Sequence, residues 1–272
     1  MVKKLFKHEI LSYLRLLIPV YIALAGIAAM GRIIQFFEAD TIYYSLLRGS
    51  SLIAFGLAAG VSLLLTAIFY ILRFYKNCFT GEGYLTFTLP VTTGQLLFTK
   101  LAVAVLTVVT TATAIVLSTC LLFAGEWLVE LAKAALYLLR GAVEYFGITH
   151  ICLFAAEGLL LLLVTVIAEV LLYYTCISVG QTFRKNRILA AVGIYFAWYL
   201  LMQVVSTVFS MFFSFFMMAE LPIVEQLMLW MEQNVAPTIH IFLCGYSVFM
   251  MIYGGLEYLV TYLAIRKKLN LE

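Results

Sequence analysis

One stretch of the sequence decides the fold class: residues Ile151–Gly180 read ICLFAAEGLLLLLVTVIAEVLLYYTCISVG, with Glu157 and Glu169 as the charged side chains. A helix needs about 20 mostly apolar residues to cross the hydrocarbon core of a bilayer. Strands of a membrane barrel would instead alternate polar and apolar residues over segments of about ten, and this stretch does not. It therefore predicts a transmembrane helix.

Five further runs of similar composition lie on either side of this stretch. The six predicted spans are about Leu16–Phe37, Ser50–Leu72, Leu96–Ala124, Ile151–Gly180, Ile188–Met218 and Ile239–Ile265. Of the 272 residues, 65% are hydrophobic and 11% are charged, whereas soluble domains carry about 25% charged residues. This composition disfavours a soluble enzyme, a disordered chain and a secreted disulfide scaffold. The predicted fold is an all-α, polytopic membrane helix bundle of six transmembrane helices, forming one transmembrane domain over 1–272.

The distribution of basic residues predicts the orientation of the spans. If the N-terminus is cytoplasmic, 13 of the 17 Lys and Arg residues fall on the cytoplasmic side. They are Lys3, Lys4, Lys7, Arg15, Arg73, Lys76, Lys100, Arg184, Lys185, Arg187, Arg266, Lys267 and Lys268. Because cytoplasmic loops carry an excess of Lys and Arg, both termini are predicted to be cytoplasmic.

Residues 1–15 have the pattern of an amphipathic helix that lies in the cytoplasmic interface. Their apolar residues recur at helical spacing, and basic side chains fall between them. The alternative is a signal peptide, since a basic start and an apolar stretch lead to small residues over 23–29. The amphipathic basic region and the five spans that follow favour the interfacial helix.

The segment between the second and third spans, residues 73–95, is predicted to form a structured cytoplasmic elbow. Gly81 and Gly83 indicate a turn, and Pro90 ends whatever helix precedes it. Thr92 and Gln95 have the spacing of a capping box, so the third membrane helix is expected to begin there. On the other side of the membrane, the loops 125–150 and 219–238 carry apolar residues at helical spacing, which favours interfacial or re-entrant helices.

The sequence lacks the motifs of the common membrane enzymes. It has no GxxxxGK[ST] phosphate loop, no HExxH zinc motif and no GxSxG nucleophile elbow. The five cysteines are widely spaced and are interpreted as small buried hydrophobic residues, with neither a metal nor a disulfide implied. We therefore expect no catalytic residue, no metal site and no nucleic-acid partner.

Three glutamates within the apolar runs need an explanation, because a carboxylate in hydrocarbon costs about 3 kcal/mol. Glu157 and Glu169 lie in the fourth span and Glu257 in the sixth. One reading is a proton or cation relay, or polar groups that face a substrate path. The other is neutral carboxyl groups that hydrogen-bond between helices or reach the headgroups.

Gly56 and Gly60 form a GxxxG motif that permits close helix packing, within the chain or in a dimer.

Two segments carry a resemblance to a known family. Residues Arg73–Lys100 read RFYKNCFTGEGYLTFTLPVTTGQLLFTK, and residues Ala264–Glu272 read AIRKKLNLE. Together with the six spans and the amphipathic N-terminal helix, these segments resemble the permease subunits of bacterial (Firmicutes-like) ATP-binding-cassette exporters of the type-2 class.

The resemblance implies a mechanism and a set of partners. Two permease chains, identical or homologous, pair in the plasma membrane, and two separate ATPase subunits bind ATP and Mg²⁺, so this chain itself holds no cofactor and is not an enzyme. The elbow is a coupling helix that docks in a cleft of the ATPase. The residues carried over by position are Glu82, Gly83, Tyr84, Leu85, Thr86, Phe87, Thr88, Leu89 and Pro90. The implied function is half of an export pathway for a hydrophobic or amphiphilic peptide, lipid or drug.

Two other classes of function remain open at this point. An ion-coupled secondary transporter would use Glu169 and Glu257 as carriers, although the chain shows no internal repeat and no broken helices in matching positions. A membrane sensor or immunity protein would bind a peptide or lipid without moving it.

Overall fold

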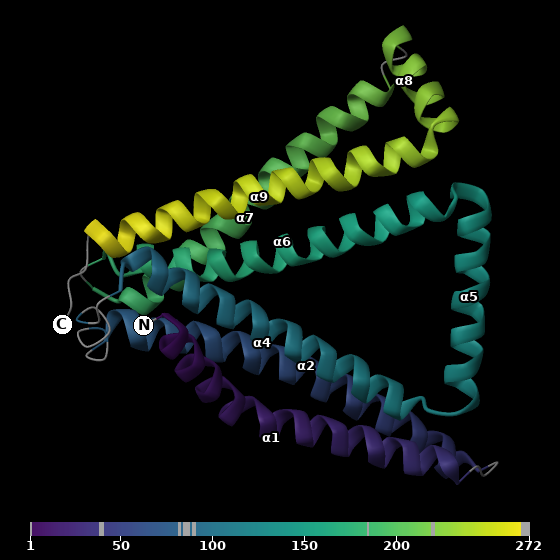
Figure 1. Ribbon diagram of the computed structural model, residues 1–272, viewed down its shortest axis with the longest axis horizontal. Coiled ribbons are helices and arrows are strands. Elements are labelled where there is room, and N and C mark those ends of the chain that lie inside the picture. Colours follow the sequence, from purple (N-terminus) through teal and green to yellow (C-terminus); the bar gives the residue numbers. More distant parts are fainter. Residues whose placement is uncertain are drawn as a thin grey trace. The chain divides into compact units, whose positions relative to one another are not determined.

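The computed structural model describes residues 2–37, 41–80, 83, 88, 91–183, 185–218 and 221–267. These ranges are almost entirely α-helical and contain no β-strand, which confirms the predicted all-α fold (Figure 1). The helices are α1 (Val2–Phe36), α2 (Ile42–Phe79), α4 (Thr93–Leu122), α5 (Glu126–Phe146), α6 (Ile148–Gly180), α7 (Arg187–Met218), α8 (Pro222–Gln233) and α9 (Val235–Lys267).

Six of these helices are long and apolar enough to cross a membrane: α1, α2, α4, α6, α7 and α9. Large apolar side chains cover their surfaces; Ile22 of α1, for example, is 66% exposed and Phe212 of α7 is 71% exposed. Such a continuous apolar surface is unfavourable in water but is solvated by lipid tails. The chain is therefore a multi-pass membrane protein.

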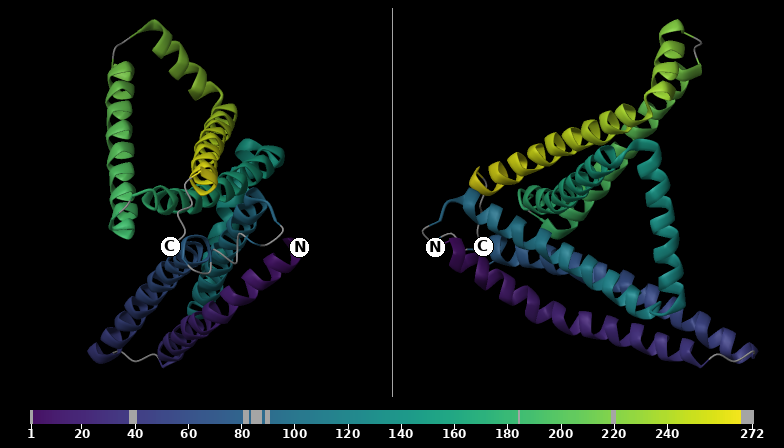
Figure 2. Two further views of the ribbon diagram at one scale, coloured as in Figure 1. Left: turned by 90° about the vertical axis from the view of Figure 1, so that its left-hand side faces the viewer. Right: turned by 45° about the vertical axis from the view of Figure 1, so that its right-hand side comes forward.

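The helices divide into two compact units, one ending at Gly141 and the other beginning at Ala142. That the chain forms a single transmembrane domain stays a prediction. Unit 1 contains α1, α2 and α4, and Figure 2 shows these helices side by side. Unit 2 contains α6, α7, α8 and α9, of which α6 packs against both α7 and α9. The boundary falls within α5.

Unit 1 is held together by residues that recur on one face of each helix. The buried residues of α2 follow a spacing of mostly four, which places them on a single stripe. They are Phe55, Ser62, Thr66, Tyr70, Phe74 and Cys78. At its centre, the Thr111 hydroxyl hydrogen-bonds Tyr21 Oη at 2.7 Å and Thr66 Oγ1 at 2.9 Å, so one threonine of α4 links to α1 and α2.

The first helix differs from the prediction in its extent. The sequence predicts an interfacial helix over 1–15 and a separate span from 16, but α1 runs through both without a break and contains Pro19. One face of α1 is buried from its first turns onward, with Glu9, Tyr13 and Leu17 each 4% exposed or less. Because this face packs on α2 and α4, tertiary contacts keep the two predicted elements in one helix.

Unit 2 is built on a close contact between α6 and α9. A methyl group placed on Gly254 of α9 would lie 3.6 Å from Cα of Ala168 in α6, so the two backbones pass near each other there. Further along, Thr175 Oγ1 donates to the Glu257 carbonyl at 3.0 Å and hydrogen-bonds Thr261 Oγ1 at 2.8 Å. In contrast, α7 has no buried residue anywhere in 187–218.

The connections follow the local signals only in part. The capping box is confirmed, since the Thr92 side chain accepts from the Gln95 amide and the Gln95 side chain accepts from the Thr92 amide. The 125–150 and 219–238 loops contain α5 and α8.

The interpretation of all five cysteines as buried is wrong: Cys78 and Cys176 are buried, but Cys120, Cys152 and Cys244 are exposed. A thiol on a membrane helix can face lipid at little cost, so an apolar run does not by itself predict burial.

The predicted orientation can be tested by labelling single cysteines introduced at exposed lysines. In a variant that lacks the native cysteines, we expect Lys133→Cys in α5 to react with a membrane-impermeant maleimide in intact cells. We expect Lys185→Cys, before α7, to react only after the membrane is permeabilised, because the basic residues of that loop are predicted to be cytoplasmic. The opposite pattern would mean that the orientation is inverted.

Candidate functional site

A buried ionic cluster lies at one end of unit 1, centred on the Glu9 carboxylate. Oε1 accepts hydrogen bonds from Lys100 Nζ and Asn77 Nδ2, both at 3.0 Å, and Oε2 accepts from Arg73 Nε. The side chains of Glu9 and Lys100 are each 4% exposed, and that of Arg73 is 22% exposed. The Arg73 guanidinium also lies 5.2 Å from the centre of the Tyr13 ring. The carboxylate is therefore paired with two cations and an amide donor.

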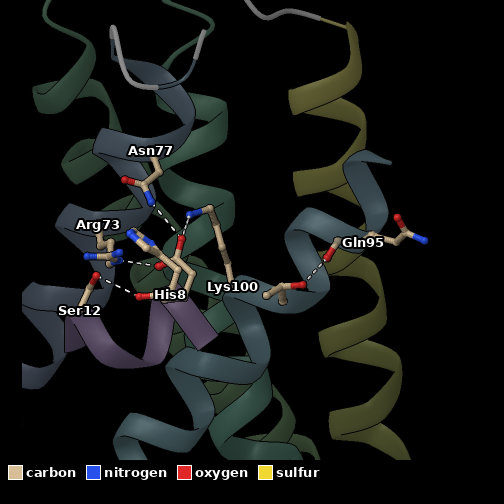
Figure 3. Close-up of polar contacts among 8 residues, drawn as sticks. His8, Ser12, Arg73, Asn77, Gln95 and Lys100 are labelled. Carbon is tan, nitrogen blue, oxygen red and sulfur yellow. Dashed lines mark hydrogen bonds and ion pairs between the residues drawn. The ribbon is translucent and has the colours of Figure 1, made fainter. Parts of the chain in front are cut away.

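Three helices contribute to this Glu9 cluster, and Figure 3 shows Arg73 and Asn77 from α2 and Lys100 from α4 pointing toward one another. Arg73 and Asn77 lie about one turn apart in the last two turns of α2. Lys100 lies about two turns into α4, and Glu9 lies about two turns into α1. The cluster thus ties together the end of α2 and the start of α4, the two helices that the predicted elbow connects.

The sequence predicts Arg73 and Lys100 to be cytoplasmic basic residues and indicates no role for Glu9. The structure instead pairs both basic residues with Glu9, across 64 and 91 residues of chain. A signal was present: Glu9 is an acidic residue on the same helical face as Tyr13 and Leu17, a face that is otherwise apolar. An acidic residue on the buried face of a helix requires a partner.

Most of the predicted coupling residues lie outside the described residues: Glu82, Tyr84, Leu85, Thr86, Phe87, Leu89 and Pro90. Of the other two, Gly83 is buried and its amide donates to the Thr80 carbonyl at 2.7 Å, while Thr88 is exposed.

In unit 2, a polar chain joins the first turns of α6 and α9. His240 Nδ1 is 2.9 Å from both carboxylate oxygens of Glu157, and His240 Nε2 is 3.0 Å from Nδ1 of His150. The ring of Phe154 lies 4.4 Å from the ring of His240, centre to centre. Glu157 and His240 are both partly buried, so this glutamate is a carboxyl group that hydrogen-bonds between helices. His150 and His240 are 90 residues apart in the sequence, and the fold brings them together.

The other two intramembrane glutamates differ from each other. Glu257 is 5% exposed, and its Oε2 is buried without a hydrogen-bond partner among the described residues. Glu169 is exposed on the surface of unit 2. Glu257 lines a cavity between α6, α7 and α9, and Glu169 is not among the residues that line this cavity.

The predicted GxxxG contact is not made within unit 1. Gly56 and Gly60 are exposed, and a methyl group added to either would have no other atom within 4 Å. Contact with another chain or with lipid stays open for this surface.

Across the residues that the structure describes, no group of three or more His, Cys, Asp and Glu side chains is placed to hold a metal ion.

Comparison of the chain with family models, with curated proteins and with solved structures finds no match. The resemblance to exporter permeases therefore stays a prediction that rests on the two sequence segments and on the membrane topology.

Proposed function

We propose that this chain is the permease subunit of an ATP-driven exporter in a bacterial plasma membrane. It forms half of a pathway for a hydrophobic or amphiphilic substrate and pairs with a second permease chain, identical or homologous. Two separate ATPase subunits bind ATP and Mg²⁺ and contact the connection between α2 and α4. The chain itself has no catalytic role.

The observation that supports this proposal most is the position of the Glu9 cluster. A force applied to the connection between α2 and α4 reaches the ends of both helices first. Glu9 joins those ends to each other and to α1 through buried charge-assisted hydrogen bonds, which are stronger than neutral ones. The three helices of unit 1 would then respond to movement of the connection as one body, as a lever requires.

The first test is the composition of the complex. We expect the chain, purified in mild detergent from the cells that produce it, to carry a nucleotide-hydrolysing subunit and, in liposomes, to move substrate only when ATP is supplied. Transport by the chain alone, driven by a proton gradient, would instead support an ion-coupled transporter. Binding without transport, unchanged when the ATPase is deleted, would support a sensor or immunity protein.

The second test is a charge in the predicted coupling segment. We expect Leu85→Asp and Phe87→Asp each to lower substrate-stimulated ATP hydrolysis at least tenfold, because an apolar protein contact does not tolerate an unpaired carboxylate. Phe87→Leu is the matched control, since it keeps the apolar character and should retain most of the stimulation. Full coupling in both aspartate variants would remove the argument from the elbow.

A further inference from the structure

Unit 2 contains a cavity of about 430 Å³ between α6, α7 and α9. This volume lies in the range of pockets that hold drug-sized ligands. Its wall is mostly aliphatic and aromatic, with Trp198 and Met202 from α7, Phe249 and Tyr253 from α9, and Cys176 from α6. Such a wall fits a hydrophobic ligand.

One charged residue, Glu257, interrupts this apolar wall. Glu257 is only 5% exposed, and its Oε2 lacks a hydrogen-bond partner in the described part of the chain. A buried carboxyl oxygen without a partner costs free energy, and most buried polar groups are satisfied. In a membrane helix, such a group is a candidate site of function rather than of stability.

The surroundings hold this carboxyl in place. Thr175 of α6 donates to the backbone carbonyl of Glu257, which fixes the turn of α9 that carries it. On the other side, Tyr253 Oη accepts a hydrogen bond of 2.8 Å from Trp198 Nε1, and its hydroxyl lies beside the carboxyl. The two aromatic rings are thereby oriented next to the acidic group, with centres 6.2 Å apart.

We propose that this cavity is a binding site for a lipophilic cation. The positive charge would pair with Glu257 once a rotation of its side chain brings the unpartnered Oε2 to the cavity surface, and the apolar body would lie among the aromatic and aliphatic side chains. The faces of Trp198 and Tyr253 attract a cation, and this attraction is larger where water is excluded. The proposal names a substrate class for the transport function and in that respect rests on it, but binding itself is a property of the isolated chain.

A neutral lipid tail is the other occupant that an apolar cavity admits. It would fill the cavity equally well with or without a carboxyl group, so it gives Glu257 no role. The two occupants differ in their dependence on charge, which an experiment can measure directly.

The test is calorimetric titration of the purified full-length chain in neutral detergent with tetraphenylphosphonium, a lipophilic cation. Tetraphenylborate, of the same shape and opposite charge, serves as the paired probe, and each titration is corrected for binding to empty micelles. We expect one saturable site for the cation, and binding of the anion at least tenfold weaker. This comparison uses the unaltered protein and needs no variant.

Substitutions then locate the site. We expect Glu257→Gln to weaken cation binding at least tenfold, which corresponds to about 1.4 kcal/mol. Glu169→Gln is the matched control: it makes the same chemical change in the same unit, on an exposed side chain that does not line the cavity, and should leave the affinity within twofold. The proposal is overturned if the cation does not bind, if the anion binds as tightly, or if Glu257→Gln binds the cation as the unaltered chain does.

The outcome is separate from the coupling proposal, because the titration contains neither ATP nor an ATPase. Saturable cation binding by a chain that carries no ATPase partner would retain the site and remove the exporter. An ATPase partner together with no cation binding would retain the exporter and remove the cation site.

Discussion

Glu9→Gln is expected to lower the free energy of unfolding by about 3–5 kcal/mol, because it removes the carboxylate from a buried ion pair. Lys100, 4% exposed, would then hold an ammonium group within unit 1 against a neutral amide. The measurement is reversible unfolding in mixed detergent micelles, followed by circular dichroism. Arg73 is less affected, since it is partly exposed and also contacts the Tyr13 ring.

A second substitution separates the loss of the Glu9–Lys100 ion pair from any general damage to the helix. In the double variant Glu9→Gln/Lys100→Met, no buried ammonium remains, and the methionine keeps most of the apolar volume of the lysine stem. We expect the double variant to recover more than half of the stability that the single variant loses, which is a coupling that independent sites do not show. A Glu9→Gln variant within 1 kcal/mol of the unaltered chain would contradict the buried pairing.

Gly180→Ala is expected to destabilise the junction of α6 and α7 by about 1–3 kcal/mol, as overpacking does. A methyl group at Gly180 would lie 2.7 Å from Cβ, 2.8 Å from Cα and 2.8 Å from N of Ala191. Two of these are backbone atoms, so a side-chain rotation cannot relieve the contact and the first turns of α7 must move. The same unfolding assay measures this loss.

Gly193→Ala is the control for Gly180→Ala, because it makes the same change in α7 only two residues beyond the contact residue Ala191. A methyl group at Gly193 meets nothing within 4 Å. Alanine is the better helix former, so this variant should be more stable by about 0.5–1 kcal/mol. If the two substitutions had the same sign and size, the close approach of α6 to α7 would not hold.

The fold class could be predicted because its signals are local. Each membrane span is a continuous apolar run, and the capping box at Thr92 and Gln95 is a pattern of four consecutive positions. The ends of the helices were harder to predict. The buried stripe of α2 continues through Phe74 and Cys78, so α2 extends to Phe79, seven residues beyond the predicted end of the span. Packing, not hydrophobicity alone, decides where such a helix ends.

The polar sites could be predicted only as isolated residues. Glu157 was identified as a residue in need of a partner, but His240 lies 83 residues away and no spacing rule joins them. Glu9 was missed for the same reason. The assumption that an apolar neighbourhood means burial failed at Cys120 and Cys244, because in a bilayer the outside of the protein is as apolar as its inside.

The Glu9 cluster also sets an order of events during synthesis. Glu9 leaves the ribosome 91 residues before Lys100, which at about 5–20 residues per second is a delay of roughly 5–20 s. Arg73 follows Glu9 by 64 residues, so until that point α1 carries an acidic side chain with neither cationic partner yet made. The Glu9 cluster can therefore be complete only after the start of α4 has been made.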